Sequence, residues 1–395
     1  MIYTATLAEQ RAAIKRRKTV VHRDLTPVDD PQVAPCSHPS PLLQGRMVGC
    51  VVMAGGQATR LGSHLPKGVI PFSPVAGKPL LQLIAEKAKA YSVCYGIEPR
   101  LAIMTSEATD AATRELFERR HFFGLTNVDF FIQPSLPLLD MEGRVITEDG
   151  NTLLTGPDGN GSVFSALMRS GIVSRWEESG VQAVSIILVD NPLLDPFCPA
   201  LLAPIFAGID LTAAAIERMD SDGQVGVFAK EKGRIHVVEY SEIDPTLFTK
   251  KDRTGRFAFA WANISAFGCS IGYLQAASNL HLPLHVAKKQ VKGHEVWKAE
   301  YFVFDGMAAA QTIALVPLVR EECFAPIKDM ASFEKARSAM MDRDRRRFFA
   351  LTHTEADPTA SFELAPSAFY PTDRFLTALR SDTLPPGFVE ESSSS

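Results

Sequence analysis

The stretch VVMAGGQATRLGSHLPK, residues Val51–Lys67, decides the expected fold. It begins inside an apolar run, Met47 to Met53, which is typical of a buried strand. The run breaks at Gly55-Gly56, and two cations follow, Arg60 in the turn and Lys67 after a proline. Adjacent glycines at a strand end permit positive φ and let a ligand approach main-chain N–H groups, which phosphate binding requires. An ordinary tight turn explains the glycines alone, but the two cations favour phosphate.

Three phosphate-binding patterns can be compared with this stretch. The P-loop pattern is not met, because Ser63 rather than a lysine follows Gly62. The dinucleotide fingerprint GxGxxG is absent, because the glycines at the strand end are adjacent. The pattern that fits is GGxxTRLGxxxPK, so the stretch resembles the signature of sugar-nucleotide pyrophosphorylases.

Length and composition describe an ordinary globular protein. The chain has 395 residues, of which 46% are hydrophobic and 22% charged, enough for one large domain with appendages. The net charge of −4 gives no electrostatic case for nucleic acid or an anionic membrane. The 6 cysteines form no CxxC pair, which argues against a zinc site and a disulfide framework. We find no membrane-length apolar run and no signal sequence, and expect a cytoplasmic protein with reduced thiols.

Strand and helix patterns alternate through the first half of the chain. Such alternation predicts an α/β fold, with a mostly parallel mixed sheet and helices on both faces. Ligands in these sheets bind beyond the carboxyl ends of the strands, where we expect the functional residues. The predicted strands are Met47–Met53, Leu101–Met104, Val128–Gln133 and Ala183–Val189, and the predicted helices are Pro79–Tyr91, Ala108–Arg120 and Gly161–Ser170.

After Leu211 the pattern indicates antiparallel strands, which we interpret as the sugar-facing half of the same domain. The charged segment from Glu334 to Ala350 predicts a helix. The predicted strands are a hairpin of Gln224–Lys230 with Arg234–Tyr240, and short strands at Asn263–Phe267, Phe302–Phe304 and Ile313–Leu318.

We expect small appendages at both ends of the chain. Residues 1–46 comprise a short helix within Met1–Lys18 and a lead-in, Thr26–Pro41, whose five prolines predict an extended segment rather than a packed element. Residues 47–330 form the catalytic domain. Residues 331–395 form a small C-terminal appendage that ends in a serine tail.

Three polar features stand where ligands are expected. Asp190 ends an apolar strand, and its carboxylate is either a turn or helix-cap residue or a Mg²⁺ ligand. The loop Pro157-Asp-Gly-Asn-Gly161 is either a turn or a close contact for a base or sugar. The amide of Gln133 matches the O4 and N3–H edge of uracil, although a surface glutamine is the commoner explanation.

The chain resembles the eukaryotic-type UDP-N-acetylhexosamine pyrophosphorylases from about Val51 to Asp329. The resemblance implies a Rossmann-like nucleotide-diphospho-sugar transferase fold. One departure is Ser162, which stands where a second glycine is usual. The motifs that carry the resemblance are GGQATRLG with PK, IMTSEATD (103–110), FFGL (122–125), LPLLD (136–140), PDGNG (157–161), VDN (189–191), VVEYSE (237–242), Asn263, HVAKK (285–289), FVFD (302–305) and REECFAPIKD (320–329).

The resemblance also implies roles for single residues. It implies Gly55, Gly56, Arg60 and Lys67 on the UTP phosphates, Gln133 and Gly159 on uracil, Asn160, Glu239 and Asn263 on the N-acetylhexosamine with Phe302 and Phe304 nearby, Asp190 on Mg²⁺, and Lys298 and Lys328 on the phosphates at the new junction.

The implied reaction joins UTP and N-acetylglucosamine 1-phosphate into UDP-N-acetylglucosamine and releases pyrophosphate. Two alternatives stay open. One is a broad UDP-sugar pyrophosphorylase, and the other is a nucleotide-sugar-binding homologue without turnover.

Overall fold

The computed structural model describes residues 5–16, 22, 24–31, 37–223, 225–380 and 387–390. Some sequence expectations therefore lie outside the described residues. These are the ends of the predicted helix Met1–Lys18, part of the lead-in with Cys36, the first hairpin residue Gln224, and the serine tail.

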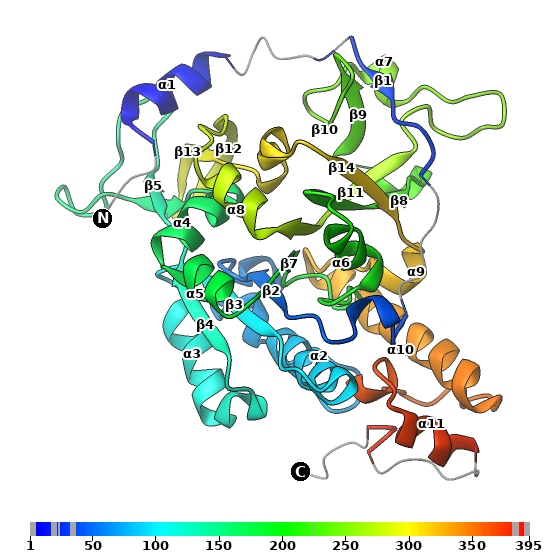
Figure 1. Ribbon diagram of the computed structural model, residues 1–395. Coiled ribbons are helices and arrows are strands. Elements are labelled where there is room, and N and C mark those ends of the chain that lie inside the picture. The colour runs from blue at the N-terminus through cyan, green and yellow to red at the C-terminus, as the bar shows by residue number, and fades with distance from the viewer. Residues whose placement is uncertain are drawn as a thin grey trace.

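A mixed sheet of ten strands runs through the centre of the molecule (Figure 1). Its main path is β1-β9-β11-β7-β2-β3-β4, and the consecutive strands β7, β2, β3 and β4 are mutually parallel. The predicted α/β class with a mostly parallel mixed sheet is thus confirmed at the nucleotide end. The parallel strands are β2 (Val48–Met53), β3 (Arg100–Thr105), β4 (Val128–Ile132) and β7 (Ala183–Leu188).

The other half of the sheet is largely antiparallel. The predicted hairpin is confirmed as β9 with β10, and β1 pairs with the outer edge of β9. The strand predicted at Asn263–Phe267 is the middle of the longer β11, which bulges where Ser265 takes a φ of 54°. These strands are β1 (Thr26–Pro27), β8 (Leu211–Glu217), β9 (Val227–Glu231), β10 (Arg234–Val238), β11 (Trp261–Ser270) and β14 (Ile313–Pro317).

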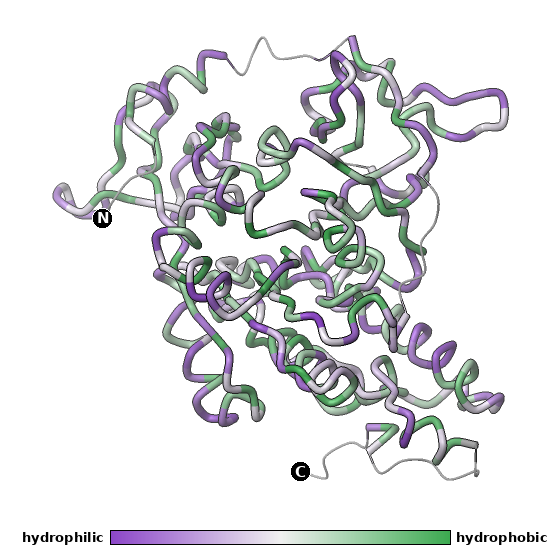
Figure 2. Tube along the Cα trace, in the orientation of Figure 1, coloured by the Kyte–Doolittle hydropathy of each residue, from purple (hydrophilic) through white to green (hydrophobic). Residues whose placement is uncertain are grey.

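Helices cover both faces of the sheet, because alternate side chains of β2 enter two separate cores. Cys50 and Val52 pack with Leu81 of α2 in one core. Val51 and Met53 belong to the other core, with side chains of α4 and α5. Figure 2 shows hydrophobic residues through β2 and α2, and a hydrophilic loop after α7. The helices are α1 (Leu7–Arg16), α2 (Leu80–Tyr95), α3 (Asp110–Arg119), α4 (Val163–Arg169), α5 (Ile172–Glu178), α6 (Pro199–Phe206), α7 (Pro245–Phe248), α8 (Ile271–Ser278), α9 (Arg320–Cys323), α10 (Met330–Thr352) and α11 (Asp373–Arg380).

Two small sheets stand beside the main one. The hairpin of β12 (His285–Val291) and β13 (His294–Glu300) contacts α1, and β5 (Ser135–Pro137) pairs with β6 (Thr155–Pro157). β6 leads into the PDGNG loop, and β13 leads into Tyr301, so the two sheets deliver these segments to one place.

The strand predicted at Phe302–Phe304 is wrong. The chain leaves β13 after Glu300 and enters a 3₁₀ helix, Val303–Ala309. Val303 N–H donates to the Asn160 side chain at 2.9 Å instead of to a neighbouring strand. Gly306 also packs so closely on the Phe164 ring that a Cβ there would lie 2.5 Å from it. Aromatic alternation alone did not reveal these contacts.

The described parts of the lead-in are largely exposed, as expected for an extended segment, but particular contacts anchor them to the protein. Thr26 and Pro27 add a strand to the edge of β9. His38 is buried, with ring nitrogens 2.6 Å from Tyr95 Oη and 2.8 Å from Asp195 Oδ2, and it stacks on Tyr370 of the C-terminal segment. A proline-rich sequence can therefore still supply an edge strand near one end and a buried side chain near the other.

Cysteine usage differs in one respect from the expectation of reduced thiols. Cys50, Cys94, Cys269 and Cys323 are free, but Cys198 is disulfide-bonded.

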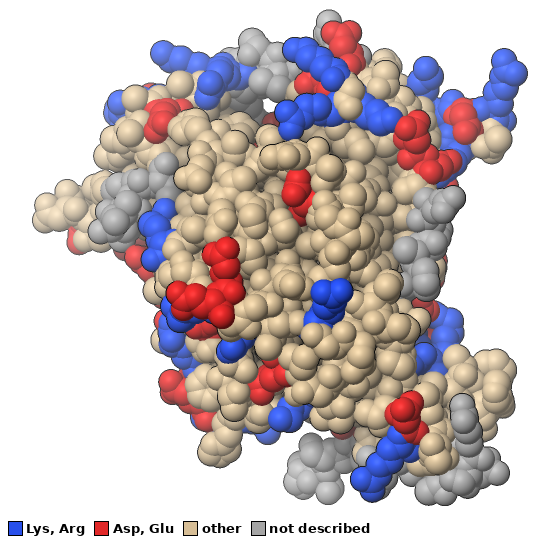
Figure 3. All heavy atoms as spheres, viewed as in Figure 1, with Lys and Arg blue, Asp and Glu red and all other residues tan. Residues whose placement is uncertain are grey.

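The surface and the helices bear on the class of partner. Among the described helices, none has both the length and the apolar character needed to cross a bilayer. On the face shown in Figure 3, charges of both signs lie mostly around the rim. This mixture agrees with the small net charge of −4.

Candidate functional site

The carboxyl ends of four adjacent parallel strands place the predicted nucleotide residues together. β2 ends at the glycine turn, β4 ends before Gln133, and β7 ends before Asp190. Main-chain bonds hold these ends level: Val189 N donates to Met53 O at 3.2 Å, and Gln133 N to Thr105 O at 2.7 Å. The structure thus brings these segments to one edge of the sheet, as ligand sites in such sheets require.

The glycine turn is a close-packed corner, and its first residue needs glycine for lack of space. A Cβ on Gly55 would collide with Gln133 Oε1, and Gly55 O accepts from Ser106 Oγ at 2.9 Å. Gly56 is exposed, and its carbonyl accepts from Lys67 N at 3.0 Å. Neither glycine has a positive φ, contrary to the sequence expectation; that conformation occurs at Gly62, with a φ of 71°.

Lys67 and Asp190 form an ion pair across the site. Lys67 Nζ lies 3.1 Å from Asp190 Oδ2 and donates to Ile327 O at 2.9 Å. The side chains are 14% and 25% exposed, so the pair is reachable from solvent while being held by its neighbours. Ile327 N in turn donates to Asp190 O at 2.8 Å, so these three residues are tied together.

Arg60 and Lys328 are exposed cations near this pair. Lys328 directly follows Ile327, and its main-chain N donates to Ser332 Oγ at 2.8 Å. Donors of Ser332 hold the pKa of Asp329 below its ordinary value, and the charge of Arg60 adds to this, so Arg60 lies near the start of α10. The predicted cations Arg60, Lys67 and Lys328 therefore all adjoin the segment Ile327–Asp329.

Gln133 is buried and bound to the PDGNG loop. Its Nε2 donates to Gly159 O at 2.5 Å, and Ser162 Oγ donates to Asp158 Oδ1 at 2.7 Å. Ser162 also donates to Gly159 O at 3.0 Å. The serine that departs from the family pattern therefore forms hydrogen bonds within its own loop. Gln133 and Gly159 therefore lie side by side, and the amide nitrogen of Gln133 is occupied by the loop.

The glycines of this loop make room for the chain after β13. Gly159 has a φ of 93°, and a Cβ there would collide with Tyr301 O. Gly161 N donates to Tyr301 O at 2.9 Å, and Tyr301 N donates to Asp158 O at 2.7 Å. Asn160 uses its Oδ1 to accept from Val303 N, so its Nδ2 is the group left to meet a ligand.

We expect Gly159→Ala to destabilise the protein by about 1–3 kcal/mol more than Gly150→Ala, the usual cost of overpacking. Both glycines have positive φ, but a Cβ on Gly150 meets nothing within 4 Å. Urea unfolding of the two variants measures the difference. Equal midpoints and slopes for both variants would contradict the close packing of the loop on Tyr301.

Among the predicted sugar residues, Glu239 is a half-buried carboxylate with Asn263 beside it. Burial and the nearby Glu242 raise the pKa of Glu239, while His285 and Lys328 oppose the rise. Gly226 approaches Glu239 so closely that its Cβ would lie 3.1 Å from Glu239 Oε1. Asn263 N donates to Gly226 O at 2.9 Å, which places Asn263 beside the same group.

His285 forms a clamp that sequence reasoning missed. Its Nδ1 and Nε2 each lie 2.9 Å from a carboxylate oxygen, Glu242 Oε1 and Asp305 Oδ2. The ring stacks on Phe302 at 4.4 Å, and Phe302 lies 5.1 Å from Phe304. Burial alone would lower the pKa of His285, but the two carboxylates raise it to about 10. The motifs HVAKK, VVEYSE and FVFD contain the three residues, yet no pattern within any one of them predicts the pairing.

Lys298 stands apart from the other predicted catalytic cations. Its Nζ pairs with Glu300 Oε1 at 2.8 Å, and its Cε would lie 3.4 Å from a Cβ on Gly156. It therefore borders the strand that leads into the PDGNG loop. No contact between Lys298 and the Lys67–Asp190 pair is found among the described residues.

The comparisons with known proteins agree with this geometry. A family model described as UTP--glucose-1-phosphate uridylyltransferase matches residues 5–386. UDP-N-acetylglucosamine diphosphorylase 1 of Arabidopsis thaliana is 34% identical over 325 residues, covering 76% of this chain and 64% of the relative. UDP-N-acetylhexosamine pyrophosphorylase-like protein 1 of Homo sapiens is 33% identical over 328 residues, covering 76% and 65%. The chain thus spans less than two thirds of the length of these relatives.

Solved structures share the fold. A putative UDP-N-acetylglucosamine pyrophosphorylase from Entamoeba histolytica has a TM-score of 0.76 at 23% identity, covering 88% of this chain and 98% of that one. The uridine diphosphate N-acetylglucosamine pyrophosphorylase from Trypanosoma brucei, in complex with an inhibitor, has a TM-score of 0.79 at 22% identity, covering 95% and 86%. By its family model and its relatives, this chain belongs to the UTP--glucose-1-phosphate uridylyltransferase family, in which it resembles the UDP-N-acetylglucosamine pyrophosphorylases.

Proposed function

We propose that this chain transfers the uridylyl group of UTP to N-acetylglucosamine 1-phosphate, forming UDP-N-acetylglucosamine and pyrophosphate. The observation that carries the proposal is the meeting of the glycine turn, Gln133 and the Lys67–Asp190 pair at one sheet edge. The names of the similar proteins support the choice of substrates.

In the proposed reaction an oxygen of the sugar phosphate attacks the α-phosphorus of UTP. A new phosphorus–oxygen bond forms, the bond to the β,γ-diphosphate breaks, and pyrophosphate leaves. The nucleophile is already anionic, so no general base and no covalent enzyme intermediate are required. Bringing two polyanions together is the main barrier, so positioning and charge neutralisation by Arg60, Lys67 and Lys328 carry catalysis. Lys298 is proposed to meet phosphate from the side of the PDGNG loop.

Asp190 fits a Mg²⁺ ligand. Only its Oδ2 is engaged by a described side chain, Lys67, and the carboxylate is 25% exposed. Mg²⁺ is usually held by one or two carboxylates together with substrate phosphates and water. Bound there, the ion would add positive charge beside the phosphates of UTP.

A sugar 1-phosphate panel tests the proposal. Purified protein, UTP and Mg²⁺ are mixed with N-acetylglucosamine, N-acetylgalactosamine, glucose or galactose 1-phosphate, and pyrophosphate release is measured, with a chelator arm for the metal. No release with any sugar favours a homologue without turnover. Similar rates with all sugars favour the broad UDP-sugar enzyme, an alternative supported by the glucose-1-phosphate name of the family model.

We expect N-acetylglucosamine 1-phosphate to exceed glucose 1-phosphate by at least about tenfold in kcat/KM, or about 1.4 kcal/mol. The difference in kcat/KM is expected because glucose 1-phosphate lacks the acetamido group and leaves the Asn160 side chain unpaired. Asn160→Asp keeps the acceptor for Val303 N–H but removes the Nδ2 donor, so it should narrow the gap. Asn279→Ala, on an exposed helix end, is the matched control. If Asn160→Asp leaves the ratio of the two kcat/KM values unchanged, Asn160 does not contact the acetamido group. Glu239→Ala should weaken the binding of both sugar phosphates.

A further inference from the structure

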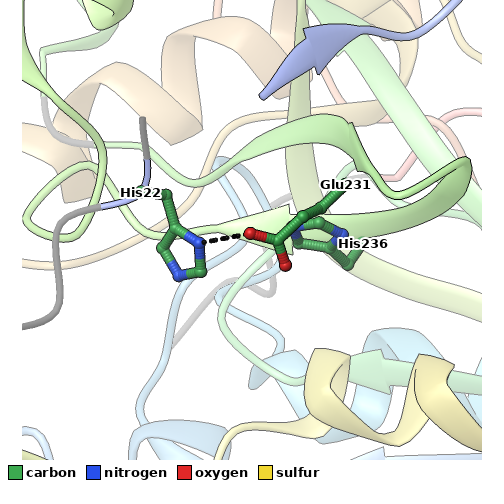
Figure 4. Close-up of side chains that lie close together, drawn as sticks. All are labelled: His22, Glu231 and His236. Carbon is green, nitrogen blue, oxygen red and sulfur yellow. Dashed lines mark hydrogen bonds and ion pairs between the residues drawn. The ribbon is translucent and has the colours of Figure 1, made fainter. Parts of the chain in front are cut away.

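His22, Glu231 and His236 come together outside the site described above (Figure 4). One ligand atom from each lies within 4.8 Å of the others, and all three side chains are half-buried. Among the described residues, these three are the one group of His, Cys, Asp or Glu side chains placed closely enough to hold a metal ion together. Glu231 ends β9, His236 lies in β10, and His22 comes from the N-terminal segment.

Main-chain bonds fix His22 in place. Its N–H donates to Glu242 O at 2.7 Å, and its carbonyl accepts from Asp244 N at 3.2 Å. The segment therefore adds a short parallel bridge at Ile243. The imidazole of His22 is held against the hairpin, with Nδ1 only 3.4 Å from Glu231 Oε1.

His236 has a nitrogen that lacks a partner. Its Nδ1–H points to Arg234 O at 3.4 Å, which leaves the lone pair on Nε2. That Nε2 is buried and forms no hydrogen bond with any described residue. A buried acceptor without a partner is costly, and a metal ion would satisfy it. An imidazole that donates from one nitrogen to a carbonyl and presents the other is the usual form of a histidine ligand.

The basic side chains next to the cluster are engaged with other groups. The nearby Arg234 directs its Nη2 to Ala308 O at 3.1 Å. Lys230, before Glu231, pairs with Asp29.

We propose that His22, Glu231 and His236 bind a Zn²⁺ ion that ties the N-terminal segment to the β9–β10 hairpin. Tetrahedral zinc holds its ligand atoms about 3.3–3.5 Å apart, the spacing that His22 and Glu231 already have. Two imidazoles and one carboxylate select zinc over Mg²⁺, which prefers oxygen ligands. The lack of a CxxC pair argued against a zinc site in the sequence, but the site proposed here uses no cysteine.

The ion would lie next to the sugar region. Glu242 accepts from His22 through its carbonyl and binds His285 through its carboxylate. Fixing His22 therefore steadies the turn that carries Glu239 and Glu242. The inference does not depend on the proposed reaction.

Zinc binding by the full-length protein tests the proposal. After chelator treatment and dialysis, Zn²⁺ alone is added, and bound metal is measured by elemental analysis and competition with a chromophoric chelator. We expect one zinc per chain in the parent and in His294→Gln, which changes an exposed histidine at the start of β13. His236→Gln and Glu231→Gln should weaken binding by at least about tenfold, because each removes one ligand.

Two further measurements keep the test decisive. His22→Gln replaces the ligand on the N-terminal segment. It tests the zinc site if the variants of the β9–β10 hairpin do not fold. The spectrum of the Co²⁺ form should lack thiolate bands, which separates this site from the free cysteines. The thermal midpoint should rise with Zn²⁺ in the parent and His294→Gln but not in the ligand variants. Parent affinity in the ligand variants, or no uptake by the parent, would overturn the site.

Discussion

Lys67→Ala should lower kcat by about 10²–10³-fold, the usual loss when one electrostatic group at a reacting centre is removed. Lys67 Nζ is held between Asp190 Oδ2 and Ile327 O, so its charge is in position before substrate arrives. In the proposed transfer, charge moves from the α-phosphate to the leaving pyrophosphate, and a fixed cation would stabilise that movement more than it stabilises bound UTP. The loss should therefore appear in kcat more than in KM for UTP.

Steady-state kinetics with N-acetylglucosamine 1-phosphate measures the effect of Lys67→Ala. Lys89→Ala is the control, because Lys89 is exposed on α2 and donates to Gly124 O at 2.9 Å. Lys67→Arg keeps the charge with a different shape and should fall between the two. If Lys67→Ala turns over at the parent rate, Lys67 has no part in the chemistry.

His285→Gln should lower the free energy of unfolding by about 3–5 kcal/mol near neutral pH, the typical cost of breaking a buried ion pair. Glu242 and Asp305 would face each other without the imidazolium between them. The amide of glutamine can donate from one end only, so one carboxylate keeps no partner. Because the Phe302 ring stacks on His285, the variant should also weaken sugar-phosphate binding.

The destabilisation by His285→Gln should depend on pH. Folding raises the pKa of His285 from 6.5 to about 10, so its stabilisation is complete below pH 6.5 and is lost as pH rises through about 10. Urea unfolding between pH 6.5 and 10 should show the parent and the variant converging as pH rises. His294→Gln controls for loss of an exposed histidine. A constant gap across this range would contradict the ion-pair clamp.

Much of the nucleotide half could be predicted from the sequence. Buried parallel strands read as continuous apolar runs, so the sequence predicts β2, β3 and β7 to within about one residue at each end. The half-buried edge strand β4 is predicted equally closely. The rule that ligands lie beyond strand carboxyl ends placed Gly55, Gln133 and Asp190 on one edge before any contact was known. The family motifs implied which residues meet the sugar, but they did not predict the contacts among those residues.

Local patterns were wrong where long-range contacts decided the backbone. The alternating aromatics of Phe302 and Phe304 indicated a strand, but the side chain of Asn160 takes the Val303 N–H and the chain turns into a 3₁₀ helix. Gly55 is needed for space against Gln133 and not for a positive φ. Such choices depend on neighbours that are remote in sequence.

The sequence by itself determined where the strands of the nucleotide half lie along the chain, the ligand-bearing turns and the resemblance to a family, because periodicity and short motifs are local properties. Only the tertiary structure decided which charges meet. Lys67 binds Asp190 across 123 positions and Ile327 across 260, and His285 reaches Glu242 and Asp305 from a separate hairpin. These pairings follow from the order of strands in the sheet and from close packing, which bring together residues that no window of sequence contains.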